Sequence, residues 1–344
     1  MIREAIAALV QGNSLSFQEA KQVMEEIMSG EATSAQFAAF TTALRIKGES
    51  IEEITGLASV MREKAVTVPV TPPVIDTCGT GGDSLSCFNI STTTAFVVAG
   101  AGVKVAKHGN RAMSSGCGSA DTLEALGVKI DLGAEEVSQC IEQAGIGFMF
   151  APLFHPSMKH AAAPRREIGI RTIFNVLGPL SNPAKAEYQL IGVPSREIGN
   201  KLASALYRLG TKHSLVVHGI DGMDEITISG KSFVWDINEQ GASSPYEICP
   251  DDFGITTACI EDIRGGTPTE NAKILRRILK GQKGPRRDIV VMNAAAALVA
   301  SNKAPDFMTG IDMARETIDN GHATDRLEKL IELSQKLSAS IQKE

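Results

Sequence analysis

Hydrophobic positions in the first 65 residues are spaced as in amphipathic helices, and helix-start signals recur between them. Three capping boxes, in which a hydroxyl residue precedes an acid or amide by three positions, occur at Ser16/Glu19, Thr33/Gln36 and Ser50/Glu53. Glycines that can end a helix precede them at Gly12, Gly30 and Gly48. The pattern predicts four short helices that form a small helical domain over residues 1–65.

Residues 66–73, with the sequence VTVPVTPP, interrupt this pattern. The three prolines remove backbone donors and push the residues before them into extended geometry. We therefore expect a linker or hinge at 66–73 and a second domain over residues 74–344. Helices from about 165–188 are expected to join the helical domain.

Beyond the linker, short β-rich runs alternate with helical segments. The runs cover residues 74–76, 103–106, 146–150, 190–193 and 214–218. This alternation predicts an α/β fold, in which a mostly parallel central sheet is flanked by helices. A hairpin is predicted between residues 225–228 and 232–237, whereas residues 156–178 and the chain from Glu270 are expected to be chiefly helical.

Composition and charge restrict the class of protein. A chain of 344 residues exceeds the usual size of one hydrophobic core, and 43% hydrophobic residues supply ample apolar surface for two. The net charge of −6 argues against a broad basic surface for nucleic acid or anionic lipid. No secretory signal or membrane-spanning run is recognised, and the six cysteines show no CxxC or zinc spacing. We expect a cytoplasmic enzyme with reduced thiols.

The strongest chemical signal is the glycine-rich segment DTCGTGGD at residues 76–83, directly after a predicted strand. Glycines let backbone N–H groups approach a phosphate without interference from a Cβ. The segment is neither a Walker A loop nor a GxGxxG motif, and taken alone it could be a structural turn. Hydroxyls in NIST at residues 89–92 then begin an apolar helix, where they could bind a phosphate, cap the helix, or do both.

Further polar clusters follow later predicted strands. They are KHGNR at 107–111, SSGCGS at 114–119 and DGMDE at 221–225. Open α/β sheets bind ligands at the carboxyl ends of their strands. Mg²⁺ is usually held by one or two carboxylates together with substrate phosphate oxygens, which makes Asp224 and Glu225 a candidate metal site beside the phosphate loop.

These motifs, together with RREIGIRTIFNVLGPLSNP at 165–183, occur in an order that resembles the anthranilate phosphoribosyltransferase family of tryptophan biosynthesis. The resemblance covers essentially the whole chain. It implies an enzyme that transfers the phosphoribosyl group of phosphoribosyl pyrophosphate to the amino group of anthranilate, with Mg²⁺ as cofactor. It also implies a homodimer formed through the small helical domain.

The resemblance further implies roles for individual residues. Those expected to bind phosphoribosyl pyrophosphate are Gly79, Gly82, Asp83, Cys87, Asn89, Ile90, Ser91, Thr92, Lys107, Ser115 and Ser119. Those expected to meet anthranilate are Gly79, His108, Asn110 and Arg165, and the expected Mg²⁺ ligands are Ser91, Asp224 and Glu225. Cys87 departs from the family, which usually has a hydroxyl residue there, so its backbone rather than its sulfur is expected to matter. Arg166 and Arg171 are expected to form ion pairs or to pack locally.

The implied chemistry needs no general base, because an aromatic amine is already neutral at pH 7. Lys107 and Mg²⁺ are expected to stabilise the departing pyrophosphate electrostatically. The main alternative is a pyrimidine nucleoside phosphorylase, which shares some motifs, but Arg165 and the Asp224–Glu225 pair favour the transferase. A nucleic-acid-binding relative would be expected to carry a basic surface, and an inactive homologue would not be expected to keep all the polar clusters.

Overall fold

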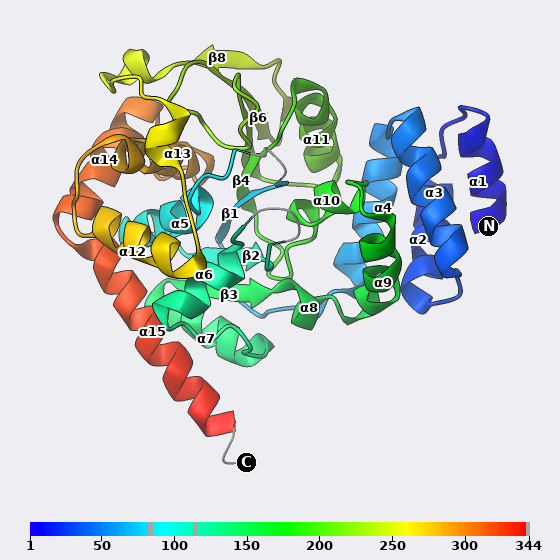
Figure 1. Cartoon of the computed structure of the whole chain (residues 1–344), viewed down its shortest axis with the longest axis horizontal. Helices are drawn as coiled ribbons and strands as arrows, with labels where there is room; N and C mark the ends of the chain where they lie inside the picture. Colours follow the sequence, from blue (N-terminus) through cyan, green and yellow to red (C-terminus); the bar gives the residue numbers. More distant parts are fainter. Residues whose placement is uncertain (82–84, 113–115, 342–344) are drawn as a thin grey trace.

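The computed structural model describes residues 1–81, 85–112 and 116–341. The chain begins with four helices, which lie side by side at one end of the molecule (Figure 1): α1 (Ile2–Val10), α2 (Phe17–Ser29), α3 (Ser34–Lys47) and α4 (Ile51–Lys64). All three expected capping boxes are present. The carboxylate of Glu53 also accepts from Leu15 N and Lys47 Nζ, so one buried acid links the starts of α2 and α4 with the end of α3.

An eight-stranded sheet forms the centre of the rest of the molecule. Its strands are β1 (Ile75–Gly79), β2 (Val105–Gly109), β3 (Ile146–Phe150), β4 (Tyr188–Gly192), β5 (His213–Gly219), β6 (Ser232–Asn238), β7 (Gly241–Ala242) and β8 (Tyr246–Ile248). The order is β3-β2-β1-β4-β5-β6-β7, with β8 also paired to β6. Strands β1 to β5 are mutually parallel and β6 is antiparallel to β5. The strand order changes direction between β1 and β4, and such switch points are where open α/β sheets bind ligands.

Each face of the sheet is covered by helices. The remaining α-helices are α5 (Ile90–Gly100), α6 (Ser119–Leu126), α7 (Ala134–Ala144), α8 (Ala151–Phe154), α9 (Lys159–Ile168), α10 (Phe174–Leu177), α11 (Arg196–Arg208), α12 (Pro268–Leu279), α13 (Pro285–Ala300), α14 (Phe307–Asp319) and α15 (His322–Ile341). Four 3₁₀ turns span Pro156–Met158, Pro179–Ser181, Pro250–Phe253 and Ile260–Ile263. Leu190 and Ile191, neighbours on β4, belong to different hydrophobic clusters, because successive strand residues face opposite sides of a sheet.

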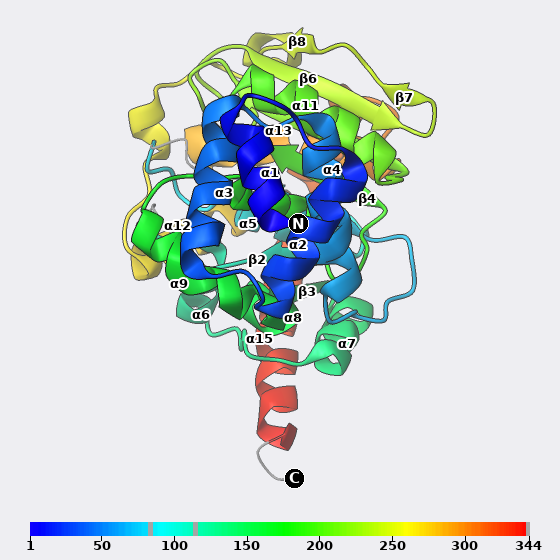
Figure 2. The same ribbon diagram turned by 90° about the vertical axis from the view of Figure 1, so that its right-hand side faces the viewer.

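One cluster lies between the sheet and the group α5 and α12–α15. The other joins the opposite face of the sheet to α11, α9, α10 and the four N-terminal helices, which lie in front of the sheet in Figure 2. Phe174 of α10 packs against Phe37 of α3, with ring centroids 5.2 Å apart. A segment from the middle of the chain therefore completes the core of the N-terminal helices.

The expected hairpin is wrong in its first half. Residues 225–228 form no strand, and β6 pairs with β5 instead. Ile226 N donates to Oδ1 of Asn293 on α13, and Ile226 O accepts from Nδ2 of the same side chain, each at 2.9 Å. The Thr227 amide donates to Ser232 Oγ, so side chains take the bonds that a partner strand would need. No described helix is long and apolar enough to cross a bilayer.

Candidate functional site

A cavity of about 1100 Å³ opens beside the switch point, at the carboxyl ends of β1 and β2. The residues nominated from the sequence that line it are Gly79, Cys87, Asn89, Ile90, Ser91, Thr92, Lys107, His108, Asn110, Ser119, Arg165, Asp224 and Glu225. Gly82, Asp83 and Ser115 lie outside the described residues. The fold thus brings into one cavity side chains from segments as far apart as β1, α9 and the turn after β5.

Two paired glycines make room for the acidic turn. Gly79 and Gly192 are partners at the ends of β1 and β4. A Cβ on Gly192 would lie 1.5 Å from the Asp224 carbonyl oxygen, and one on Gly79 would lie 2.2 Å from Asp224 Oδ2. Both distances are shorter than any real contact, so the backbone of Asp224 requires glycine at position 192, and the position of the Asp224 carboxylate requires that no Cβ be present at position 79.

The acidic turn bonds to the two segments expected to bind phosphate. Asp224 Oδ2 accepts from Gly81 N at 2.7 Å, and Glu225 Oε1 accepts from Ser91 N at 3.1 Å near the start of α5. Both acids are 9% exposed. Two carboxylates therefore lie on backbone amides that would also suit phosphate oxygens.

Lys107 is a buried cation under the glycine-rich segment. Its Nζ donates to Thr77 O at 2.5 Å. Burial lowers the pKa of Lys107, and the nearby Asp76 carboxylate opposes this shift. Burial also raises the pKa of Asp76 to about 6, although Lys107 and the amide of Asn182 act against it. Lys107 therefore brings a buried amino group to the cavity lining, with the Asp76 carboxyl close enough to act on its pKa.

His108 and His155 form an aromatic pair in the cavity lining, with ring centroids 5.0 Å apart. Burial is the main cause that lowers the pKa of His108 to about 3 and that of His155 to about 4. Both rings are consequently neutral at pH 7. They are weak bases in this environment, but they offer flat surfaces to an aromatic ligand.

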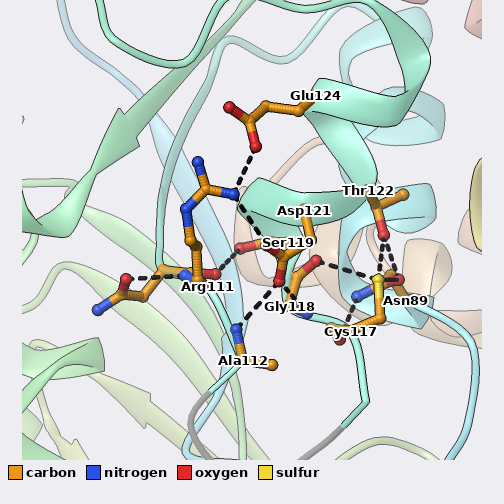
Figure 3. Close-up of polar contacts among 10 residues, drawn as sticks. Asn89, Arg111, Ala112, Cys117, Gly118, Ser119, Asp121, Thr122 and Glu124 are labelled. Carbon is orange, nitrogen blue, oxygen red and sulfur yellow. Dashed lines mark hydrogen bonds and ion pairs between the residues drawn. The ribbon is translucent and has the colours of Figure 1, made fainter. Parts of the chain in front are cut away.

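The loop that carries Asn110 is held by one carboxylate. Asp121 accepts from the amides of Ala112 and Gly118 and from the Arg111 guanidinium, as Figure 3 shows. Ser119 Oγ donates to Asn110 O at 3.3 Å. The side chain of Asp121 therefore holds together the described backbone next to Asn110 and Ser119, two residues that line the cavity.

Arg165 lies on α9, which packs against α2 and α3, and it reaches the cavity from the side of these N-terminal helices. Its guanidinium carbon lies 5.5 Å from the centre of the Phe174 ring, and burial lowers its pKa. Among the described residues no carboxylate forms an ion pair with Arg165. Arg171, for which an ion pair or local packing was expected, donates to Thr80 O in the glycine-rich segment.

Cys87 and Thr92 differ in what they offer the cavity. The backbone of Cys87 forms an isolated bridge with Arg264. The Thr92 side chain is buried, and its Oγ1 has no hydrogen-bond partner among the described residues. A buried hydroxyl without a partner is costly, so Thr92 Oγ1 is suited to a polar ligand group.

Sequence reasoning missed His155 and Asn271, which also line the cavity. His155 follows α8, the short helix directly after β3, and a histidine soon after a predicted strand is a usable signal. Asn271 lies inside α12, and no motif surrounds it. Its contacts involve residues far away along the chain.

The described residues contain no group of three or more His, Cys, Asp or Glu that could hold a metal alone. The oxygens of Asp224 and Glu225 are nevertheless hard ligands in a buried position beside the backbone amides of Gly81 and Ser91. This donor set fits Mg²⁺, which commonly takes one or two carboxylates and completes its shell with substrate oxygens and water.

Comparison with known proteins places this site in a family. Residues 3–65 match the helical bundle domain of a glycosyl transferase family, and residues 71–324 match its a/b domain. The chain is 56% identical over 340 residues to anthranilate phosphoribosyltransferase of Dehalococcoides mccartyi, with 98% of this chain and 100% of the relative covered.

Solved structures agree with the sequence matches. Anthranilate phosphoribosyltransferase from Thermus thermophilus superposes with a TM-score of 0.90 at 43% identity, covering 96% of this chain and 99% of that one. The Saccharomyces cerevisiae enzyme in complex with PRPP and Mg also gives a TM-score of 0.90, at 28% identity and coverages of 97% and 98%. The chain therefore belongs to the anthranilate phosphoribosyltransferases, within the glycosyl transferase family.

Proposed function

We propose that the protein transfers the phosphoribosyl group of 5-phosphoribosyl 1-pyrophosphate to the amino group of anthranilate, giving N-(5-phosphoribosyl)anthranilate and pyrophosphate in tryptophan biosynthesis. The carrying observation is one cavity whose lining combines two acids bonded to backbone amides with the aromatic pair His108 and His155 and the Arg165 guanidinium. Family membership, together with the PRPP and Mg of the yeast complex, supports the same assignment.

The phosphate side consists of backbone and hydroxyl donors. The amides of Gly81 and Ser91 and the orphan Oγ1 of Thr92 would bind pyrophosphate oxygens, and Lys107 supplies a positive charge below them. Mg²⁺, bound by Asp224 and Glu225, would neutralise negative charge that develops on the leaving group. Gly79, Gly82, Asp83, Cys87, Asn89, Ile90, Ser115 and Ser119 complete the proposed set.

The anthranilate side consists of His108, His155, Asn110 and Arg165. The aromatic amine is neutral at pH 7 by itself, and the neutral imidazoles add no charge beside it. No carboxylate of the described residues pairs with the Arg165 guanidinium, which can bind the anthranilate carboxylate in bidentate fashion. The chain thus positions a neutral nucleophile opposite the sugar, and catalysis rests on position and charge rather than on a base.

Arg165→Ala is expected to raise the KM for anthranilate about 10- to 100-fold, because a charged hydrogen-bonded pair is lost. The KM for phosphoribosyl pyrophosphate should stay near its wild-type value. Anthranilate fluorescence loss, followed with and without Mg²⁺, gives both constants. Arg208→Ala, which removes an exposed ion pair with Glu52 away from the cavity, is the control. Wild-type protein that is folded and consumes no anthranilate would disprove the proposed function.

The proposal includes closure of the N-terminal helices over the cavity, with bending at 66–73. The linker is bonded to other segments, since Val66 N donates to Phe154 O and Val68 N to Pro183 O. Arg62 of α4 also donates to the carbonyls of Leu180 and Leu209. Closure must therefore move these crossing segments together with the linker, so we place the hinge at residues 66–73 and about 154–183.

We also propose a cytoplasmic homodimer formed through the helical domain. Its free cysteines suit a reducing compartment. Val10 and Ile46, exposed by 73% and 82%, are apolar residues that a partner subunit would cover.

Small-angle scattering tests assembly and closure together. Wild-type protein should have twice the 36.5 kDa chain mass, and its radius of gyration should fall when both substrates and Mg²⁺ are present.

Ile46→Glu should give the mass of one chain, while Ile220→Glu, an exposed apolar position of the α/β domain, should remain dimeric. A monomeric wild type, or a radius that ligands leave unchanged, contradicts the respective proposal.

A further inference from the structure

Asn271 is a buried amide that none of the motifs contains. It lies in the first turns of α12, is 2% exposed and lines the cavity next to Asn89. The two residues are 182 positions apart in sequence. Asn271 therefore connects the C-terminal helices to the start of α5.

A directed series of hydrogen bonds runs through both amides. Gly266 N donates to Asn271 Oδ1 at 2.8 Å, and Asn271 Nδ2 donates to Asn89 Oδ1 at 2.9 Å. Asn89 Nδ2 then donates to Cys117 O at 3.2 Å. The first group is a backbone donor and the last a backbone acceptor, so neither amide can be flipped without placing like groups opposite each other.

This arrangement keeps the Asn89 side chain from capping the amino end of α5. Asn89 is the N-cap residue of α5, a position where an asparagine side chain usually accepts from the helix's own amides. Here its side chain makes no capping bond, and Oδ1 instead accepts from Asn271 and Thr122, the latter contact being visible in Figure 3. The Ser91 amide instead donates to the Glu225 carboxylate, so this helix end binds a negative group from outside the helix.

We propose that Asn271 is a positioning residue for phosphoribosyl pyrophosphate: by holding the Asn89 amide away from α5, it keeps the amino end of that helix open to phosphate. This inference rests on the proposed function. Asn271 acts only through Asn89 and touches no reacting atom. Its loss removes one of the bonds that hold the Asn89 side chain, beside those to Thr122 and Cys117, and so favours conformers in which Asn89 caps α5 and competes with the substrate for the same amides.

Asn271→Ala is expected to raise the KM for phosphoribosyl pyrophosphate roughly five- to tenfold, the cost of a competing neutral hydrogen bond. The KM for anthranilate should stay unchanged, and kcat at saturating phosphoribosyl pyrophosphate should change less than that KM. Calorimetric binding of pyrophosphate with Mg²⁺ should weaken by a similar factor. Lys273→Ala, an exposed change on the same helix, should alter none of these.

A double-mutant cycle separates positioning from general loss of structure. When Asn89 is already alanine, no side chain can cap α5, so Asn271→Ala should add no more than about a twofold change. An equal effect in both backgrounds, or an unchanged KM for phosphoribosyl pyrophosphate in the single variant, overturns the inference.

A second variant of Asn271 without added charge serves if the alanine variant fails to fold. In Asn271→Asp the carboxylate faces Asn89 Oδ1 directly, so the fallback variant is Asn271→Leu, which keeps the side-chain volume, adds no charge and has no N–H for Asn89, and with it the cycle still isolates the coupling. Lack of coupling in this cycle rejects the inference. A wild type that neither consumes anthranilate nor binds pyrophosphate with Mg²⁺ rejects the proposed function instead.

Discussion

Asp224→Asn is expected to reduce Mg²⁺-dependent turnover by about 10²- to 10³-fold, because one of two proposed carboxylate ligands is lost. The same change should strengthen the binding of pyrophosphate in the absence of metal. Asp224 places a negative charge on Gly81 N, which we propose as a phosphate-binding amide. Asparagine can keep an acceptor there while removing the repulsion between carboxylate and phosphate.

Asp224→Asn should thus weaken the binding of pyrophosphate with Mg²⁺ and strengthen its binding without the metal. Opposite changes in these two affinities distinguish this explanation from simple damage to the site. Calorimetric titration with pyrophosphate, with and without Mg²⁺, measures both. Glu225→Gln should behave alike, since Glu225 accepts from Ser91 N. Asp251→Asn, an exposed acid outside the cavity, should leave both affinities unchanged. If Asp224→Asn weakens metal-free and Mg²⁺-dependent binding equally, the carboxylate does not occupy a phosphate site.

The sequence predicts best those features whose signals are local. The capping boxes at Ser16, Thr33 and Ser50 each involve residues three positions apart, and all are present. The α/β fold follows from alternation of strands and helices, which is likewise read over short windows. Glycines after a strand and acids after a later one pointed to the cavity because parallel strands end at the same edge of a sheet.

Features that depend on distant partners could not be predicted. Residues 225–228 have the composition of a strand, but Asn293, 67 positions away, takes up the backbone of Ile226. Asn271 has no motif around it, and its role depends on Asn89. The closeness of Gly192 to Asp224 also appears only in three dimensions, since a single glycine at a strand end has many explanations.

Lys107→Met is expected to lower kcat by about 10²-fold or more while the KM for anthranilate stays unchanged. Methionine retains the length and apolar stem of lysine but loses the charge that we propose stabilises the departing pyrophosphate. Steady-state kinetics with each substrate varied in turn provides the measurement. Lys104→Met, at an exposed ion pair with Glu142 just before β2, is the control.

The same substitution should make stability more dependent on pH. Burial raises the pKa of Asp76 to about 6, and Lys107 is the first cause that opposes this rise. A carboxyl whose pKa is raised by folding favours the folded state below its ordinary pKa of 3.8, and this contribution is lost as pH rises through the folded value. Without Lys107 the pKa of Asp76 in the folded protein should rise further. The folded state then continues to lose stability as the pH approaches neutrality.

The melting temperature of Lys107→Met, relative to wild type, should accordingly fall more at pH 8 than at pH 5. Adding Asp76→Asn should remove this extra pH dependence, because no carboxyl remains to ionise in the buried position. A difference in melting temperature that is the same at both pH values would show that the Lys107 charge does not act on Asp76. The cation would then serve the leaving group alone, and the loss of kcat would stand without a pH-dependent change in stability.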